Sequence, residues 1–402
     1  MLNERVKTPG VYREDVFLTP SSELRTGVPA FLGCTARVHA NTPQLLTLWP
    51  QFEEAFGPPL PDGYLSDAVR GFFENEGQLC YVVRLDDDAE PVQALRGGLQ
   101  TLAALDAIDL VGAPDIMRPR PHPTDPNRWR PPDPNAVRTM QVAVLEHCVS
   151  SGDRFAILDS QPCADVNTVL HQRQGLSGAN GALYYPWVRG LRRPGAFSVP
   201  DCPAIAEGFI PPCGHVAGVY ARTDQRVGVH KAPANENLEG VSDLEFSLTN
   251  AQQDRLNPMG VNCLRAFPGR GLRVWGARTL SMDPAWTYIN VRRLVLTAGR
   301  WIDRNMAGVA FEPNDARLWA RVGRELTAYL GRLFQQGALQ GRTAQEAFYV
   351  KCDAETNPPE VRDAGQLVTE IGLAPAMPNE FVVVRIIHST GGVTIAGPAQ
   401  PG

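Results

Sequence analysis

The sequence predicts a mixed α/β fold, α+β overall, organised in two domains, and three observations support this prediction. A chain of 402 residues exceeds what one hydrophobic core usually organises. With 43% hydrophobic and 20% charged residues, the chain can bury a sizeable core. Through its first half, apolar runs of strand length alternate with segments of helical periodicity, which indicates strands interleaved with helices.

The first domain is expected to open with a buried strand at residues 28–33. A helix is expected at 42–56, where four apolar residues recur at helical spacing: Leu45, Leu48, Phe52 and Phe56. Gly57 would stop this helix, and Ser66 would cap the next one, at 66–76. The other expected elements are strands at 79–85, 108–111, 155–158 and 182–188, helices at 135–150 and 166–175, and a short helix through Ala217 and Tyr220.

The second half contains the two clearest helical patterns, at 289–305 and 315–336. In the second of these, the apolar residues recur four positions apart along one flank: Leu318, Val322, Leu326, Leu330 and Phe334. A capped helix at 249–257 is expected to precede a hairpin with strands at 261–264 and 272–275 around a turn at 267–270. Strands are expected at 347–352, 365–373 and 380–388, followed by a loose tail at 390–402, which is rich in glycine and proline.

Two polar segments favour simple structural interpretations. Residues 118–134 are so rich in proline that they predict neither a helix nor a central strand, and an exposed loop is expected; a ligand for a proline-binding partner is the alternative. Asp86, Asp87 and Asp88 suggest a cation site, but three adjacent carboxylates cannot all face one ion without a returning loop. A charged turn after a strand is therefore favoured.

Composition narrows the classes of partner and compartment. The net charge of −5 is mild, and the basic residues are dispersed, so nucleic-acid binding is not expected. The first residues lack the apolar segment of a signal peptide, and no apolar run approaches the ~20 residues of a membrane span, so we expect synthesis in the cytoplasm and no membrane insertion. The eight cysteines include no CxxC pair, and reduced, mostly buried thiols are expected.

The titratable residues do not assemble into a catalytic motif. His215, Asp224 and His230 could serve a pocket of an α/β enzyme, but no GxSxG or HExxH pattern accompanies them. Cys202 and Cys213 lie near His215 at a spacing that matches no zinc pattern. Residues 268–271 lack the third glycine and the lysine of phosphate-binding loops, so turn chemistry is favoured there. No catalytic residue, cofactor or metal is therefore expected.

A series of segments resembles the contractile-tail sheath proteins, which surround the inner tube of phage tails, tailocins and related injection particles. The most informative segment is GVNCLRAFPGRGLRVWGARTL at 260–280. Further matches follow in sheath order: KTPGVY at 7–12, VPAFLGCT at 28–35, CYVVR at 80–84, HVAGVYARTD at 215–224, VHKAPAN at 229–235, WTYINVRR at 286–293, FEPN at 311–314 and PNEFVVVR at 378–385. The resemblance is weakest at about 110–212, and there the expected strands and helices rest on the hydrophobic pattern of the sequence alone.

This resemblance implies an organisation around exchanged arms. It divides the chain into an N-terminal arm at 1–22, an outer domain at 23–248, an inner domain at 249–388 and a flexible tail at 389–402. The two arms would add strands to the sheets of neighbouring subunits, through Val11, Tyr12, Val16, Phe381, Val383 and Arg385. Arg321 and Arg324, or charged residues near Arg292, Arg293, Arg300 and Arg304, are the candidates to face the tube; a solvated charged face is the alternative.

The resemblance also implies a function. The chain would be a structural subunit, not an enzyme, that polymerises helically around an inner tube, in six-fold rings, and contacts baseplate and terminal cap proteins. It would shorten to drive the tube through a target envelope, with energy stored at assembly. The alternatives are an α/β enzyme of unknown reaction, and a baseplate-proximal or cap paralogue. The sequence leaves open whether the particle is a virion, a tailocin, an extracellular or a membrane-anchored device.

Overall fold

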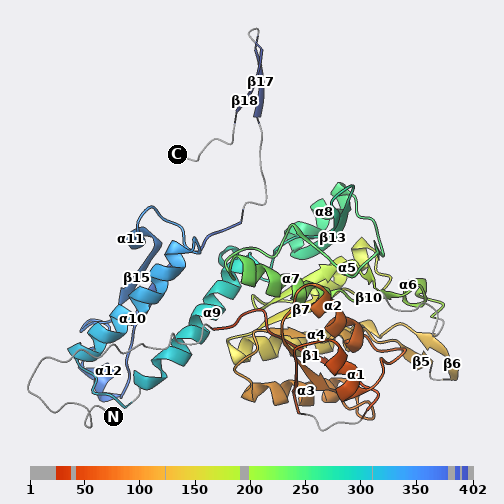
Figure 1. Ribbon diagram of the computed structural model, residues 1–402, viewed down its shortest axis with the longest axis horizontal. Helices are drawn as coiled ribbons and strands as arrows, with labels where there is room; N and C mark the ends of the chain where they lie inside the picture. The colour runs from red at the N-terminus through yellow and green to blue at the C-terminus, as the bar shows by residue number, and fades with distance from the viewer. Residues whose placement is uncertain are drawn as a thin grey trace, which may run out of the picture.

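The computed structural model describes residues 24–37, 42–122, 124–190, 199–309, 311–378, 385–389 and 392–396. A nine-stranded sheet organises the larger part of the chain, in the order β11-β14-β13-β8-β7-β4-β1-β3-β2 (Figure 1). The six strands from β13 to β3 in this order are parallel to one another, and β2, β14 and β11 pair antiparallel at the two sides. The bounds are β1 Pro29–Gly33, β2 Gln44–Leu46, β3 Cys80–Arg84, β4 Leu110–Gly112, β7 Phe155–Asp159, β8 Gly181–Tyr185, β11 Glu236–Asn237, β13 Val261–Phe267 and β14 Gly271–Trp275.

Helices cover both faces of this sheet. On one face α2 (Leu65–Glu74) packs against α7 (Cys213–Arg226), and on the other α3 (Pro91–Thr101) packs against α4 (Pro134–Ser151). Successive residues of β1 face the two layers, because side chains alternate along a strand. Phe31 contacts Phe72 of α2 with ring centroids 5.9 Å apart, whereas Leu32 lies beside Gly98 of α3. The predicted strands and helices of this domain are confirmed except as described below.

Two glycines let α7 approach α2 closely. A Cβ atom at Gly214 would lie 2.1 Å from the carbonyl oxygen of Ala68, and one at Gly218 would lie 2.6 Å from that of Phe72. Any larger residue would force the two helix backbones apart. Gly214 and Gly218 therefore serve the packing of α7 against α2.

The helix predicted at 42–56 is wrong in its first half. Gln44–Leu46 form strand β2, which pairs antiparallel with β3, and α1 spans only Pro50–Phe56. Proline has no N–H group to donate within a helix, so it sits in the first turn, where that donor would be unpaired anyway. Leu45 and Leu48 are consequently 51% and 62% exposed, and only Phe52 and Phe56 are buried.

Two further local predictions need correction. Ser66 does not cap α2; the helix begins at Leu65, and the carboxylate of Asp115 accepts hydrogen bonds from the backbone N–H groups of Tyr64 and Leu65, at 2.5 and 3.1 Å. The proline-rich segment is not a simple loop, because β5 (Arg120–His122) and β6 (Asp125–Arg130) form a two-stranded antiparallel sheet. This small sheet can contain prolines because each of its two strands is an edge strand.

Shorter elements complete the α/β part. A three-stranded sheet has the order β10-β9-β12, with strands Phe209–Ile210, Val188–Arg189 and Asp243–Leu244. The remaining helices are α5 (Val166–Gln174), α6 (Pro203–Ala206) and α8 (Asn250–Leu256). The capped helix predicted at 249–257 is confirmed as α8, and Thr249 forms a capping box with Gln252.

A second packing unit follows the large sheet. The long helices α9 (Ile289–Met306) and α10 (Ala316–Gln335) pack with a two-stranded sheet of β15 (Phe348–Lys351) and β16 (Glu370–Leu373), and with the short helix α11 (Ala344–Ala347). A further short helix, α12 (Pro359–Asp363), lies between β15 and β16 in the chain. The Trp301 ring stacks on Tyr329, with centroids 3.9 Å apart. Asp315 caps α10 through the N–H groups of Arg317 and Leu318, and Gly337 ends it with a positive φ of 77°.

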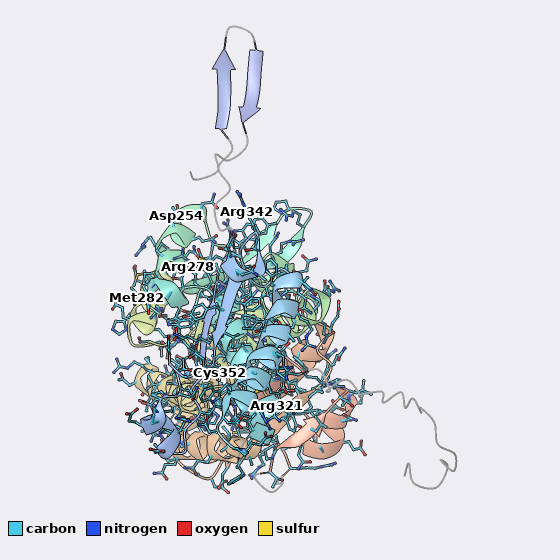
Figure 2. The ribbon with its side chains drawn as sticks, turned by 90° about the vertical axis from the view of Figure 1, so that its left-hand side faces the viewer. Asp254, Arg278, Met282, Arg321, Arg342 and Cys352 are labelled. Carbon is cyan, nitrogen blue, oxygen red and sulfur yellow. A yellow bond between two sulfur atoms is a disulfide. The ribbon has the colours of Figure 1, made fainter. Side chains whose placement is uncertain are left out.

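A hairpin near the C-terminus stands apart from both units (Figures 1 and 2). Strand β17 (Arg385–Ser389) pairs with β18 (Gly392–Ala396). The expectation of a loose tail at 390–402 is therefore wrong for the five residues of β18. The predicted N-terminal arm with Val11, Tyr12 and Val16, and the predicted arm residues Phe381 and Val383, lie outside the described residues. The predicted arm residue Arg385 begins β17 and is opposite Ala396 of β18 in the same chain. In the described part of the chain, no helix is long and apolar enough to cross a bilayer.

Candidate functional site

A buried charge cluster joins α9 to the large sheet. The guanidinium of Arg293 donates to both carboxylate oxygens of Asp224, at 2.9 and 2.6 Å, and to Asp109 at 2.9 Å. Asp109 also accepts from the backbone N–H groups of Gly27 and Val28, at 3.0 and 2.7 Å. Burial raises the pKa of Asp224, although Arg293 opposes the shift. Since the three side chains are at most 5% exposed, this cluster is structural, and Arg293 is not available to face a tube.

The candidate catalytic residues lie in structural positions. His215 is buried on α7 against Gly71, and burial lowers its pKa to about 4. Asp224 belongs to the charge cluster with Arg293. His230 is half-buried, and its backbone carbonyl accepts from the Asn290 amide at 2.8 Å.

The aspartate run at 86–88 forms a turn that is held by the guanidinium group of Arg118. The Asp88 N–H donates to the Asp86 side chain at 3.2 Å, and Arg118 donates to Asp87 at 2.6 Å and pairs with Asp62 at 2.6 Å. Within the described ranges, no group of three or more His, Cys, Asp or Glu side chains is arranged to hold a metal ion. The charged-turn interpretation agrees with this geometry.

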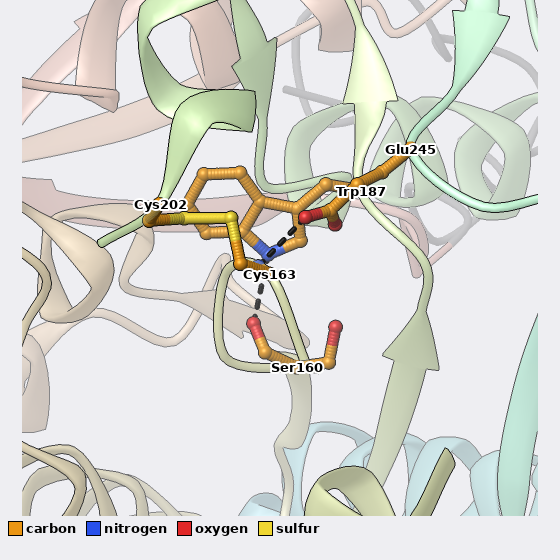
Figure 3. Close-up of a disulfide and its surroundings, with 5 residues drawn as sticks. All are labelled: Ser160, Cys163, Trp187, Cys202 and Glu245. Atoms are coloured by element: carbon orange, nitrogen blue, oxygen red, sulfur yellow. Dashed lines mark hydrogen bonds between the residues drawn. A yellow bond between two sulfur atoms is a disulfide. The ribbon is translucent and has the colours of Figure 1, made fainter. Parts of the chain in front are cut away.

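A disulfide contradicts the expectation that all cysteines are reduced. Cys163, after β7, bonds to Cys202, which directly precedes α6 (Figure 3). The Cys163 N–H donates to the carboxylate of Glu245 at 2.6 Å, and burial raises the pKa of that carboxyl to about 7. The indole N–H of Trp187 donates to the Ser160 carbonyl at 2.8 Å. The sequence carries no signal for this pair, because the cysteines are 39 residues apart and follow no motif.

An apolar groove of about 460 Å³ lies along the second packing unit. It is lined by Ile302 and Met306 from the end of α9, by Val322 and Leu326 of α10, and by Leu367, which precedes strand β16. That strand, β16, pairs in the described chain with β15 alone. An open strand edge beside an apolar groove can accept a further strand, with backbone groups paired along the edge and side chains in the groove.

Phe311 lies at this groove with its side chain fully exposed. Its φ of 70° is an unusual backbone conformation for a bulky residue. The adjacent Glu312 carboxylate pairs with Arg321 at 2.7 Å, and Asn314 donates to the Gln366 carbonyl at 2.7 Å. The sheath-like segment FEPN thus forms one wall of the groove, a role that its sequence did not reveal.

The two candidate tube-facing arginines differ in their surroundings. Arg321, on the side of the molecule that faces the viewer in Figure 2, is engaged by Glu312 and lies 3.9 Å from Glu325. Arg324 is exposed, and no ion pair to it is present among the described residues. Arg292 lies over the Trp286 ring, 4.6 Å from its centroid, and donates to Asn180 at 2.7 Å.

Comparison with known proteins gives this architecture a family. The family model for the phage tail sheath protein central domain matches residues 131–280, and the family model for the phage tail sheath C-terminal domain matches residues 281–388. The solved anti-feeding prophage (AFP) helical sheath in the contracted state is 31% identical, with a TM-score of 0.72, over 96% of this chain and 100% of that one.

The chain belongs to the phage tail sheath family. The AFP baseplate, 6-fold symmetrised, contains a chain that is 30% identical, with a TM-score of 0.72 over 96% of this chain and 100% of that one. The tail sheath protein of Vibrio phage KVP40 is 30% identical over 186 residues, 45% of this chain and 27% of the relative. The chain spans about a quarter of the length of the first such phage relatives. The sheath family is one of structural proteins, and the comparisons give no support to the enzyme alternative.

Proposed function

We propose that this chain polymerises helically around an inner tube and contracts to drive the tube through a target envelope. One observation carries the proposal: the likeness to a contracted helical sheath extends over 96% of the chain at 31% identity. The likeness to a chain of the 6-fold symmetrised AFP baseplate supports six-fold rings, and favours a baseplate-proximal position as the second candidate. Synthesis in the bacterial cytoplasm and contacts with tube, baseplate and cap proteins belong to the same proposal.

Exchange of the terminal arms links the subunits in this proposal. Residues 1–22 of one subunit, and the segment of Phe381, Val383 and Arg385 of another, add strands to the β15–β16 sheet of a third. Three features support this: a two-stranded sheet is marginally stable alone, β16 pairs with β15 alone among the described residues, and Ile371 of β16 lines the apolar groove. Each backbone hydrogen bond contributes about 1 kcal/mol net, but the bonds repeat at every subunit.

The division into an outer domain at 23–248 and an inner domain at 249–388 is part of this proposal. The inner domain would present α10 to the tube, with Arg324 as the better candidate because Arg321 is already neutralised by Glu312. The large sheet complicates a simple boundary, since β13 and β14 follow residue 248 and yet pair with β8 and β11. The boundary at residue 248 would then separate two roles in the assembled sheath, although the hydrophobic core continues across it.

Contraction uses energy stored at assembly. An extended lattice can be trapped above a contracted one that buries more surface between subunits, in the manner of other bistable packings. Calorimetry of triggered contraction should record a downhill transition that proceeds without nucleotide. A strict requirement for ATP would contradict this part of the proposal.

The arms are tested by truncation. The full chain, a variant lacking residues 2–22, and a control variant lacking only 397–402 would each be mixed with the tube protein and imaged by electron microscopy. We expect cylinders from the full chain and the control, and none from the variant without the N-terminal arm. Normal cylinders from that variant would overturn the arm exchange.

A further inference from the structure

A second depression opens where α9 meets the large sheet, and it differs in chemistry from the groove at β16. Its volume is about 250 Å³. Leu45, Leu79 and Tyr81 give it an apolar floor, and Arg25, Arg300 and Arg304 also line it. This depression, the arginine pocket, therefore suits a ligand that carries carboxylates beside large apolar side chains.

Within the described residues, none of the three arginines of the pocket forms an ion pair. Arg300 donates to two backbone carbonyls, those of Asp106 at 2.9 Å and Arg25 at 3.5 Å. Asp153, a carboxylate that interacts with Arg300 at longer range, lies 3.1 Å from the guanidinium of Arg154. Arg25 and Arg304 are exposed, and neither forms an ion pair with a described residue.

A strand edge without a partner among the described residues lies beside the arginine pocket. Strand β2 is the end strand of the nine-stranded sheet and pairs with β3 alone in the described part of the chain. Leu45, in the middle of β2, is 51% exposed. An open edge with an exposed leucine is a surface that proteins usually cover.

The chain itself supplies a matching occupant. Leu24, the first described residue, lines the pocket, so the preceding residues start from its rim. Glu14 and Asp15 carry two carboxylates, and they are followed by three large apolar residues, Val16, Phe17 and Leu18. Six residue steps separate Leu18 from Leu24, a reach of about 20 Å when extended, which is sufficient for a return over the pocket.

We propose that residues 14–18 dock in the arginine pocket of their own subunit before assembly. The carboxylates of Glu14 and Asp15 meet the arginines, and the apolar side chains that follow cover the floor with Leu45. This inference rests on the proposed exchange of the N-terminal arm, because the same segment is later given to a neighbour. Docking within one chain has a high effective concentration and so delays polymerisation until a nucleating surface competes for the arm.

Zero-length crosslinking tests the contact directly. An Arg304→Lys variant of the full chain places an amine in the pocket, and a carbodiimide couples it to a touching carboxylate. The reaction is run below the concentration of assembly, on an equal mixture of ¹⁴N- and ¹⁵N-labelled chains, and is read by mass spectrometry. We expect the introduced lysine to be joined to Glu14 or Asp15 within chains of a single isotope. A crosslink mainly between chains of different isotope would show that the arm of a second copy occupies the pocket, and it would overturn the proposal. Absence of the crosslink would overturn it as well.

Assembly kinetics provide the second readout. Glu14→Arg/Asp15→Arg removes two exposed ion pairs, so the critical concentration should fall roughly two- to thirtyfold, with a shorter lag. Adding Arg25→Glu/Arg304→Glu to that variant should restore the lag, while Arg96→Glu, an exposed reversal on α3, should leave it unchanged. An unchanged or longer lag for the arm variant contradicts docking within the subunit. If the arm exchange itself were wrong, the variant lacking 2–22 would still form cylinders.

Discussion

Removal of the Arg293 guanidinium tests how the chain fixes α9 to its large sheet. Arg293→Met keeps an apolar stem of similar length and removes the cation from between Asp224 and Asp109. Asp109 retains its two backbone donors, from Gly27 and Val28, whereas Asp224 loses two hydrogen bonds of 2.9 and 2.6 Å. Leaving a buried carboxylate without its cation typically costs about 3–5 kcal/mol. We therefore expect the free energy of unfolding to fall by that amount at pH 7.

The assay is urea unfolding of the unassembled chain, followed by tryptophan fluorescence and circular dichroism. A double variant, Arg293→Met/Asp224→Asn, removes the stranded charge and should recover part of the loss. Arg292→Met is the matched control: this half-buried neighbour rests on the Trp286 ring, and its loss should cost only about 1–2 kcal/mol. A loss below about 1 kcal/mol for Arg293→Met, or a double variant no more stable than the single one, would refute the reasoning.

Three other predictions concern the pH dependence, the disulfide and the groove. Burial raises the pKa of Asp159 to about 7, so the folded chain holds this proton more tightly than the unfolded chain. The stability that this proton contributes is lost as the pH rises from about 4 through 7. Asp159→Asn should therefore flatten the dependence of the free energy of unfolding on pH, measured by urea unfolding. Replacement of Cys163 and Cys202 by serine removes a crosslink between cysteines 39 residues apart and should lower the free energy of unfolding by about 3–5 kcal/mol. The unchanged chain should lose the same amount when its disulfide is reduced. Leu367→Asp, which places a charge in the groove, should prevent cylinder formation with the fold retained by circular dichroism, while Val368→Asp at the exposed neighbouring position should not; equal behaviour of the two would exclude the groove from assembly.

Much of the fold follows from periodicity and breakers in the sequence. The strands around Phe31 and Ile157 are continuous apolar runs, as expected for parallel strands covered on both faces, and Asp315 and Gly337 mark the ends of α10. The error at 42–56 arose because Leu45 and Leu48 satisfy helical spacing by coincidence, while Pro50 sets where the helix begins.

The parts that could not be predicted depend on contacts between distant residues. Asp115 caps α2 from 50 residues away, and Arg293 reaches an aspartate 184 positions earlier. The disulfide partner of Cys163 has no local signal either. For the candidate assembly site, the sequence suggested the strand at 365–373 and the apolar flank of α10, but not that they enclose a groove. That arrangement depends on the packing of α9, α10 and β16, which no local pattern specifies.

Helical reconstruction by cryo-electron microscopy tests the central claim most directly. Cylinders assembled from the full chain with its tube protein would be resolved to the level at which strands and their connections can be traced. The account predicts two additional strands beside β15 and β16, one traced to residues 1–22 of a neighbouring subunit and one to the segment of Phe381 and Arg385 of another. Cylinders in which the β15–β16 sheet gains no strand from any neighbour would contradict it.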